Sequence, residues 1–282
     1  MAEAAGGARS GLRLWFGLAV TTALVVAALG APWLAPHDPL AQDLLAAQLP
    51  PFWSPDADPQ YLLGTDSLGR DLLSRLLYGA RVALIVATVA AALAALLGTL
   101  LGLFAGFFGG WVDQVISRLV DVWMSFPPVL LSIVLVAVIG AGLQAVIIAI
   151  VIVDWTRFCR VVRGEVLVQR ARDYVASATT IGLGRGAILG HEILPNLLPL
   201  LVGLLGLEMG IAVIVEAILS FVGLSIASDA PSWGGLIAEG RENVYQAWWI
   251  MALPMGCIIL VMLGFNALSD GLRERFDPLL HR

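Results

Sequence analysis

No charged residue occurs between Asp121 and Asp154, and this run of apolar and small side chains is longer than one helix needs to cross a membrane. Other long stretches are almost as poor in charge. Of the 282 residues, 59% are hydrophobic and only 13% are charged, whereas a soluble domain is about half apolar and about a quarter charged. In a bilayer, apolar side chains cover the outside of a fold as well as its inside. The sequence therefore predicts an all-α membrane protein.

Six segments are candidates for spanning helices, since about 20 helical residues cross the hydrocarbon core. Gly140, Ala141 and Gly142 provide a turn that divides the charge-free run into two of these segments. The predicted spans are residues 14–34, 82–107, 119–139, 143–159, 198–224 and 248–268.

The first span follows Arg9 and Arg13, and its charged start and apolar middle are also typical of a secretory signal peptide. Pro32, Trp33 and Pro36 come next, where a signal peptide would carry a small-residue cleavage site. We therefore expect a retained membrane anchor, with a removed signal peptide as the alternative.

The arginines predict the orientation, because arginine in short loops resists translocation across the membrane. Merging the third and fourth spans would leave five and would export the arginine-rich segment 157–185, so five spans are disfavoured. Six spans with a cytoplasmic amino terminus also place the carboxyl terminus in the cytoplasm. Only Arg70, Arg75, Arg81 and Arg241 then lie outside, and the cytoplasmic arginines are Arg9, Arg13, Arg118, Arg157, Arg160, Arg163, Arg170, Arg172, Arg185, Arg273, Arg275 and Arg282.

Two segments outside the spans have patterns of their own. Residues 35–64 are rich in Pro, Asp and Gln and predict an external loop. From Ser67 to Leu84 apolar residues recur at helical spacing, which predicts an amphipathic helix at the outer interface or packed on neighbouring spans. The expected units are a cytoplasmic tail (1–13), the first transmembrane helix (14–34), an external loop with the interfacial helix (35–81), a core of five transmembrane helices (82–270) with a cytoplasmic loop at about 160–194, and a second cytoplasmic tail (271–282).

The cytoplasmic loop contains the start and stop signals of a short helix. Asp173 is expected to cap it and Gly182 to end it. The length and position of this segment predict a helix that lies parallel to the membrane and is exposed to a cytoplasmic component.

Several kinds of chemistry lack the residues that they need. Lysine is absent, so the phosphate-binding loop of ATPases cannot form, because its lysine holds the β and γ phosphates. The net charge of -5 and the scattered arginines provide no basic block for nucleic acid. Cys159 and Cys257 lack metal or disulfide spacing, and His37, His191 and His281 have no clustered partners. We expect no catalytic residue, metal site or cofactor in this chain.

Glu208 and Glu216 lie deep in the fifth predicted span, where an ionised carboxylate facing lipid is costly. They are about 80° apart around a helix, so both are expected to face the bundle interior, a partner subunit or a water-filled path. They are candidates for the translocation path, and hydrogen-bonded or protonated packing residues are the alternative. Asp121 and Asp154, near span ends, are expected to be interface or structural groups.

The loop between the fourth and fifth spans resembles the EAA loop of ABC-importer permeases. In that family Glu-Ala-Ala is followed by three residues, a Gly and, after a spacer, a Leu-Pro pair. Ala178 and Gly182 keep this spacing, and Leu194 and Pro195 form the pair. Ala176 replaces the family's Glu, so any polar contact of that Glu is not carried over.

Most of the chain, from about residue 14 to 280, resembles the second, C-type permease of dipeptide, oligopeptide and nickel importers. Five stretches carry the likeness in the family's order: LGTDSLGRDLLSRLLYGARVAL (63–84), FFGGWVDQVISRLVDVWMSFPP (107–128), EAILSFVGL (216–224), PSWGGLIAEGR (231–241) and FNALSDGLRERFDP (265–278).

This resemblance implies the type I permease fold and a role in importing di- or oligopeptides across the inner membrane. It implies that residues 173–182 form a coupling helix that docks on a cytoplasmic ATPase subunit, where ATP and Mg bind. The implied partners are a homologous second permease, two ATPase subunits and an extracytoplasmic solute-binding protein, beside the lipid bilayer. The implied ATPase-coupling residues are Asp173, Tyr174, Ala176, Ser177, Ala178, Gly182, Leu194 and Pro195.

A nickel or glutathione importer permease is the alternative within the family, although the spans contain no Met/His cluster that would favour a metal path. Outside the family, an ion-coupled secondary transporter would use Glu208 and Glu216 as a proton relay. A membrane scaffold without transport activity is the remaining alternative.

Overall fold

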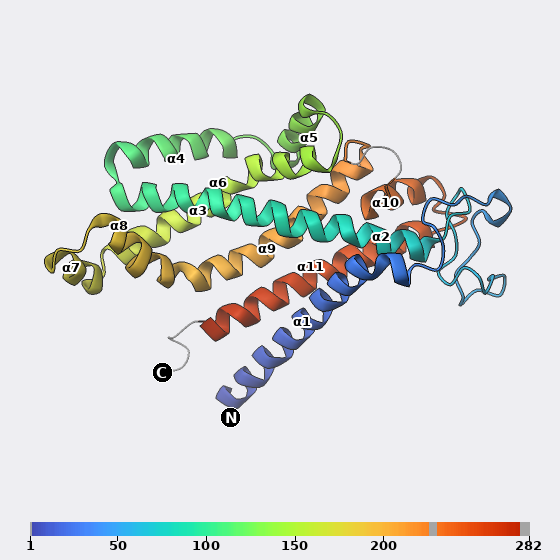
Figure 1. The fold of residues 1–282 in the computed structure, drawn as a ribbon, viewed down its shortest axis with the longest axis horizontal. Helices are drawn as coiled ribbons and strands as arrows, with labels where there is room; N and C mark the ends of the chain where they lie inside the picture. Colours follow the sequence, from blue (N-terminus) through green and yellow to red (C-terminus); the bar gives the residue numbers. More distant parts are fainter. Residues whose placement is uncertain (1, 226–229, 277–282) are drawn as a thin grey trace.

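The computed structural model describes residues 2–225 and 230–276, and within these ranges the chain is helical without a β-sheet. The long helices lie alongside one another in an elongated bundle (Figure 1). Its helices are α1 (Ala2–Leu34), α2 (Leu72–Ile85), α3 (Ala91–Phe108), α4 (Gly110–Met124), α5 (Pro128–Ile139), α6 (Leu143–Arg170), α7 (Asp173–Thr180), α8 (Arg185–Ala187), α9 (Leu194–Phe221), α10 (Trp233–Glu242) and α11 (Trp249–Phe276).

Four helices are long and apolar enough to cross a membrane, and α4 with α5 adds a fifth if this bent pair is one span. α6 has 28 residues and is also long enough, but Asp154, Arg157 and Arg160 fall within its first two thirds. The expectation of six spans is thus confirmed for four, altered for the third, and remains a prediction for α6. The four spans are Gly11–Leu34, Leu72–Phe108, Arg185–Phe221 and Trp249–Arg275.

The amphipathic helix expected from Ser67 to Leu84 begins at Leu72 and packs on neighbouring helices, which was the second of the two expected arrangements. It forms the beginning of the second span. α2 continues through a π-helical turn, Val86–Ala90, into α3, so Leu72–Phe108 is one helix of 37 residues. Leu72 and Leu76 are buried in a core shared with α1, α10 and α11. Arg75 is also buried and pairs with carboxylates of the protein rather than with lipid headgroups. The helical spacing of apolar residues predicts one buried face of α2. Other helices also cover much of the polar face of α2, which the spacing does not predict.

The third predicted span is broken into two helices. α4 ends at Met124, α5 begins at Pro128, and the two axes are bent by 89°. Pro127 and Pro128 explain the break, because proline has no N–H and is tolerated only in the first turn of a helix. The prediction of a single helix over 119–139 is therefore wrong.

The predicted turn between the third and fourth spans is confirmed. Gly140 and Gly142 separate α5 from α6. Their φ angles are 107° and 148°, which residues with a side chain rarely adopt. α6 then runs to Arg170, beyond the predicted end of the fourth span, and occupies the first part of the expected loop.

Three glycines spaced four residues apart bring α3 close to α6. A β-carbon added at Gly102 would lie 2.7 Å from the carbonyl oxygen of Cys159, and one added at Gly106 would lie 2.8 Å from Cβ of Val166. Gly98 faces α6 in the same way. Close backbone approach of this kind is a main source of helix association in lipid.

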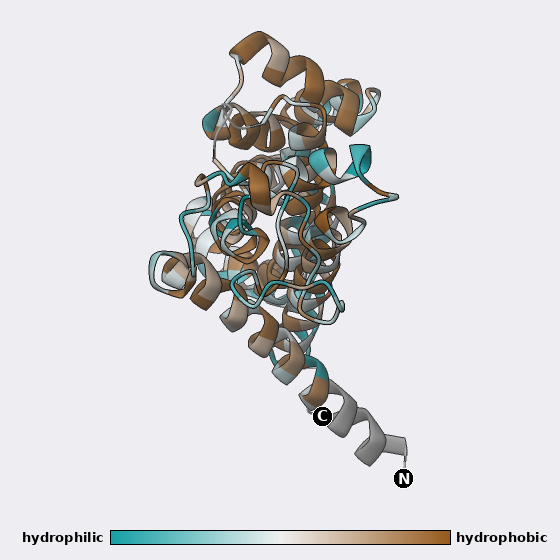
Figure 2. Ribbon diagram, turned by 90° about the vertical axis from the view of Figure 1, so that its right-hand side faces the viewer, coloured by the Kyte–Doolittle hydropathy of each residue, from teal (hydrophilic) through white to brown (hydrophobic). Residues whose placement is uncertain are grey.

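The bundle has two different ends. α7 and α8 lie at one end, which we call the α7 end, together with the beginning of α1 and the end of α11 (Figure 1). Residues 35–71 and α10 lie at the other, which we call the loop end. Figure 2 looks onto the loop end and shows mostly brown helices behind loops that are largely teal or pale. Functional side chains can therefore lie at the α7 end, at the loop end or in the interior of the bundle.

Candidate functional site

α7 ends in a Schellman motif, a common way of satisfying the last carbonyl groups of a helix. The amide of Leu183 donates to the carbonyl oxygen of Ala178 over 3.1 Å, and Gly182 has a φ of 86° that glycine adopts readily. The start of α7 differs from the prediction. Arg172 is the cap residue, without a side-chain cap bond, and Asp173 lies in the first turn, where its charge favours the helix dipole.

α7 has one fixed face and one open face. Val175 and Ala178 are each 5% exposed and pack into a core built from α3, α6 and the start of α9. Asp173, Ala176 and Ser177 are exposed on the other side. The helix is thus held firmly against the bundle while it presents a small, mostly uncharged surface to the outside.

Tyr174 connects α7 to the end of α6. Its hydroxyl donates to Oε1 of Gln169 over 2.8 Å, and Nε2 of Gln169 donates to Oε1 of Glu165 over 2.8 Å. Burial raises the pKa of the Tyr174 phenol further above neutral pH, where a phenol is protonated in any case, and the hydroxyl is a donor. These hydrogen bonds hold the Tyr174 side chain of α7 against the last turns of α6.

Leu194 and Pro195 lie at the start of α9, directly after the π-helical turn Ile188–Ile193 in the continuous helix Arg185–Phe221. Proline has no N–H to donate, and it stands where the hydrogen-bond pattern of this helix changes. Ile193, just before them, is fully buried in the core beneath α7. The predicted coupling residues thus gather around α7 and the start of α9.

Glu208 lies inside the bundle, as expected for a carboxylate that avoids lipid. It is 0% exposed and accepts a hydrogen bond of 2.9 Å from Nη1 of Arg157 on α6. Asp154, one turn before Arg157, lies 3.4 Å from the same guanidinium. One arginine therefore serves two buried acids, and Oε1 of Glu208 has no hydrogen-bond partner among the described residues.

Glu216 lies in a separate polar cluster. It is 1% exposed and accepts hydrogen bonds from the hydroxyls of Ser220, over 2.6 Å, and Ser225, over 3.0 Å. Ser232, which caps α10, donates to Ser220 over 3.0 Å. The cluster ties the end of α9 to the start of α10. The structure does not join Glu208 to Glu216, and each has its own set of partners.

Arg157, expected near the end of the fourth span, and Arg160 and Arg163, expected in the cytoplasmic loop, all lie on α6, and each pairs with an acid. Arg157 pairs with the α9 carboxylate described above. Arg160 donates to Oδ1 of Asp121 over 2.8 Å, and Arg163 donates to Oδ2 of Asp113 over 2.7 Å, both acids being on α4. Their spacing of three residues, directly after an apolar run, was the sequence signal for a charged helix face rather than a loop.

At the loop end, four charged residues link the loop to α2 and α10. Asp66, 0% exposed, accepts from Nε of Arg70 over 2.7 Å and also pairs with Arg75. Both arginines donate to Glu239 of α10, Arg70 over 3.0 Å and Arg75 over 2.6 Å. This pairing was not predictable from the sequence, because Glu239 lies more than 160 residues from Arg70 and Arg75 along the chain.

An all-helical bundle with a short exposed helix between two long ones is the fold of type I ABC importer permeases. The family described as "Binding-protein-dependent transport system inner membrane component" matches residues 98–282, and "N-terminal TM domain of oligopeptide transport permease C" matches residues 14–51. The chain belongs to the binding-protein-dependent transport system inner membrane component family. It is a membrane-spanning permease subunit of an ABC importer.

Curated relatives resemble the chain over nearly its whole length. The di/tripeptide transport system permease protein DppC of Pseudomonas aeruginosa is 38% identical over 264 residues, which cover 94% of this chain and 87% of that protein. The dipeptide transport system permease protein DppC of Escherichia coli K12 is 39% identical over 264 residues, which cover 94% and 88%.

Among solved structures, an inward-facing conformation of the MetNI methionine ABC transporter has a similar chain. The TM-score is 0.61 over 72% of this chain and 96% of that chain, at 18% identity. This likeness shows the fold alone.

Proposed function

We propose that this chain and a homologous second permease form a pathway for di- or oligopeptides, driven by two ATPase subunits that bind ATP and Mg. A solute-binding protein on the far side of the membrane delivers the peptide. The observation that carries the substrate class is the identity of 38–39% over 94% of the chain to permeases named for di- and tripeptide or dipeptide transport.

The exposed face of α7 supports coupling to an ATPase. A coupling helix must be accessible to its motor on one side and fixed to the spans on the other. α7 meets both conditions, because Ala176 and Ser177 are exposed while Val175 and Ala178 are buried. Its C-terminal cap and the Tyr174 hydrogen bond make it a rigid body. Movement of the ATPase would then tilt α6 and α9 together and switch the access of the pathway.

The positions of the arginines support a cytoplasmic location for the α7 end. Arg170, Arg172 and Arg185 flank α7, and Arg273 and Arg275 lie in the last turn of α11 at the same end of the bundle. We therefore assign both termini to the cytoplasm and the loop end to the side on which the solute-binding protein docks. In this assignment residues 14–34 form the first span and residues 35–71 the external loop. The permease core begins at Leu72 rather than at residue 82, because α2 is the start of the second span.

Uptake in a deletion strain complemented with this chain tests the proposal. Labelled alanyl-alanine, a labelled tetrapeptide, glutathione and nickel are offered separately. The expected result is uptake of one or both simple peptides that requires ATP in proteoliposomes holding the whole complex and needs no ion gradient. Uptake of nickel or glutathione alone would contradict the proposed peptide substrate. Uptake driven by an ion gradient without ATP would contradict the proposed ATP-driven mechanism.

A further inference from the structure

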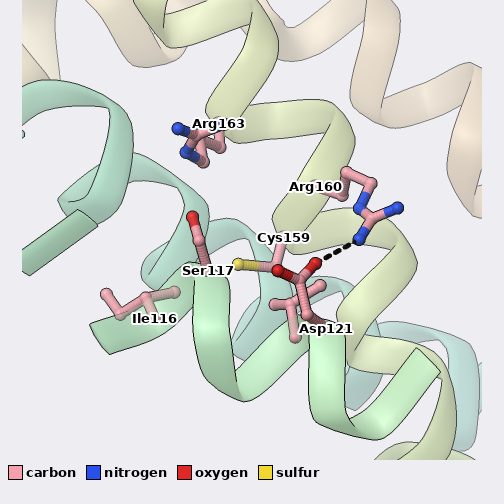
Figure 3. A pocket seen from close by; sticks show the side chains of 7 residues that line it. Ile116, Ser117, Asp121, Cys159, Arg160 and Arg163 are labelled. Atoms are coloured by element: carbon pink, nitrogen blue, oxygen red, sulfur yellow. Dashed lines mark hydrogen bonds and ion pairs between the residues drawn. The ribbon is translucent and has the colours of Figure 1, made fainter. Parts of the chain in front are cut away.

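A pocket of about 310 Å³ opens between α4 and α6. Figure 3 shows Arg160 and Asp121 reaching toward each other from the two helices, with Ser117 and Cys159 beside them. Ligand pockets in proteins begin at about 300 Å³, so the volume suits a small solute or one end of a larger one. We call it the α4–α6 pocket, and its lining includes Ile116, Ser117, Asp121, Cys159, Arg160 and Arg163.

The two ion pairs beside this pocket differ in how completely they are satisfied. Arg163 uses both Nε and Nη2 on Asp113, and Ser117 adds a hydrogen bond of 3.0 Å to the same carboxylate. Arg160 makes a single hydrogen bond to Asp121 within the described residues, and the two side chains are 52% and 55% exposed. A guanidinium has five N–H donors. Arg160 therefore has donors free for a ligand, whereas Arg163 is occupied.

α4 carries two different exposed faces. Gln114, Arg118 and Asp121 are exposed on one side, within about 60° of each other at 100° per residue. Val115 and Val122 are exposed on the adjoining apolar side, together with Trp111 and Leu119. Charged groups at membrane depth avoid lipid and face a water-filled cavity or a protein partner. The apolar side suits lipid, so the polar side, with the α4–α6 pocket at its edge, is directed into the assembly.

We propose that the α4–α6 pocket is a water-filled station on the translocation path, where Arg160 binds the carboxylate of the transported peptide. On arrival, the peptide's carboxylate replaces Asp121 on the guanidinium, and the freed Asp121 receives the peptide's ammonium group. A peptide with two free termini carries both charges, and a half-exposed ion pair exchanges for it without leaving a charge unpaired. This inference rests on the proposed function in peptide import.

Chemical labelling tests whether the pocket is wet and lies on the path. The complete complex, with its second permease, ATPases and solute-binding protein, is placed in nanodiscs and treated with the anionic thiol reagent sulfonatoethyl methanethiosulfonate. Ser117→Cys samples the pocket, and Val115→Cys is the matched control on the apolar side of the same helix. Labelling at each position is measured by mass spectrometry. We expect Ser117→Cys to react at least tenfold faster, and alanyl-alanine with ATP to slow it at least threefold.

Charge changes test the role of Arg160. Arg160→Gln is expected to lower alanyl-alanine uptake at least tenfold. Arg118→Gln, on α4 one turn before Asp121 and outside the pocket lining, is expected to change it less than twofold. The exchanged pair Asp121→Arg with Arg160→Asp keeps an ion pair in place but inverts the charges that the substrate meets. It is expected to remain as inactive as Arg160→Gln. Assembly of each variant is checked by size-exclusion chromatography.

Each result decides one question. Wild-type uptake by the exchanged pair means that the pair is only structural and overturns the inference. Labelling of Ser117→Cys no faster than Val115→Cys also overturns it, because the pocket is then closed to water. Fast labelling that peptide does not slow overturns it as well, because the pocket then lies off the path. If a charge variant fails to assemble, the labelling result decides alone. Failure of the unaltered complex to import any peptide refutes the proposed function instead, so the two failures are distinguishable.

Discussion

Gly102 of α3 faces the backbone of Cys159 on α6, and a β-carbon on Gly102 would lie 2.7 Å from the Cys159 carbonyl oxygen. A backbone carbonyl in the middle of a helix cannot move aside, so any side chain at this position separates the two helices. We expect Gly102→Leu to lower the stability of the folded permease by about 1–3 kcal/mol, the usual cost of overpacking. Thermal unfolding of the purified complex in detergent measures this loss.

Gly164→Ala is the matched control for Gly102→Leu. Gly164 lies on α6, the same helix as Cys159, but an added β-carbon there would have no neighbouring atom within 4 Å. It should leave the melting temperature unchanged or raise it slightly, since alanine favours helix over glycine. Equal losses for Gly102→Leu and Gly164→Ala would show that α3 and α6 do not pack as described.

Arg157 is expected to stabilise the folded permease because its positive charge compensates the buried carboxylates of Glu208 and Asp154. Arg157→Leu leaves Glu208 and Asp154 buried without their cation, and breaking a buried pair costs about 3–5 kcal/mol. The partial exposure of Arg157 places the expected loss at the lower end of this range. The double variant Arg157→Leu with Glu208→Leu should regain part of it. Thermal unfolding of single and double variants checks this, and a double variant less stable than Arg157→Leu would contradict it.

Gly182 is expected to control coupling rather than insertion into the membrane. Its φ of 86° puts a β-carbon in a strained position, at a cost of about 1–2 kcal/mol, so Gly182→Val should loosen the end of α7. We expect peptide transported per ATP hydrolysed to fall several-fold in proteoliposomes, with normal amounts of assembled complex. Gly184→Ala is the control, because Gly184 has a φ of -67° and open space around it. An unchanged ratio in Gly182→Val would remove α7 from the coupling route.

The orientation can be measured with two exposed positions at opposite ends of the bundle. Ser177 lies on the open face of α7, and Leu45, 98% exposed, lies in the loop at the other end. In intact cells a membrane-impermeant maleimide should label Leu45→Cys and spare Ser177→Cys, and the pattern should reverse in inside-out vesicles. The opposite pattern would place α7 beyond the reach of a cytoplasmic ATPase.

The charged network at the loop end is expected to hold the outer loop in place. Arg75→Met removes a cation that pairs with both Asp66 and Glu239, so the buried Asp66 loses a partner. We expect limited proteolysis between residues 50 and 62 to become several-fold faster. Asp56→Asn, at an exposed position of the same loop, should leave the cleavage rate unchanged. Equal rates in Arg75→Met and the unaltered chain would show that the network does not secure the loop.

Features fixed by local chemistry were predictable from the sequence. The four confirmed spans follow from length and apolarity, and the turn between α5 and α6 follows from Gly140 and Gly142. α7 ends at Gly182 as expected, because a left-handed position favours glycine. The burial of Glu208 and Glu216 follows from the cost of exposing a carboxylate to lipid.

Features that depend on a contact between distant segments were not predictable. Arg160 and Arg163 were expected in a loop, because a sequence alone does not show that acids on α4 lie opposite them. The pairing of Arg157 with Glu208 of α9 was not predictable either. Arg75 was likewise read as the polar side of an interfacial helix, although Glu239 buries it from far along the chain. The break between α4 and α5 is different, since Pro127 and Pro128 signalled it locally and the length of the apolar run concealed it.

The helix Leu72–Phe108 has 37 residues, which makes it about 55 Å long, while the hydrocarbon core of a bilayer is about 30 Å thick. The helix is therefore about 25 Å longer than the hydrocarbon core is thick. One end meets the ion pairs of Asp66 and Glu239, and at the other Phe107 packs against the core under α7. A solute-binding protein on one side of the membrane and an ATPase subunit on the other would thus act on opposite ends of the same helix. The π-helical turn Val86–Ala90 interrupts the regular α-helix between these two ends. A force applied at one end would therefore bend the helix at this turn before it reached the other end.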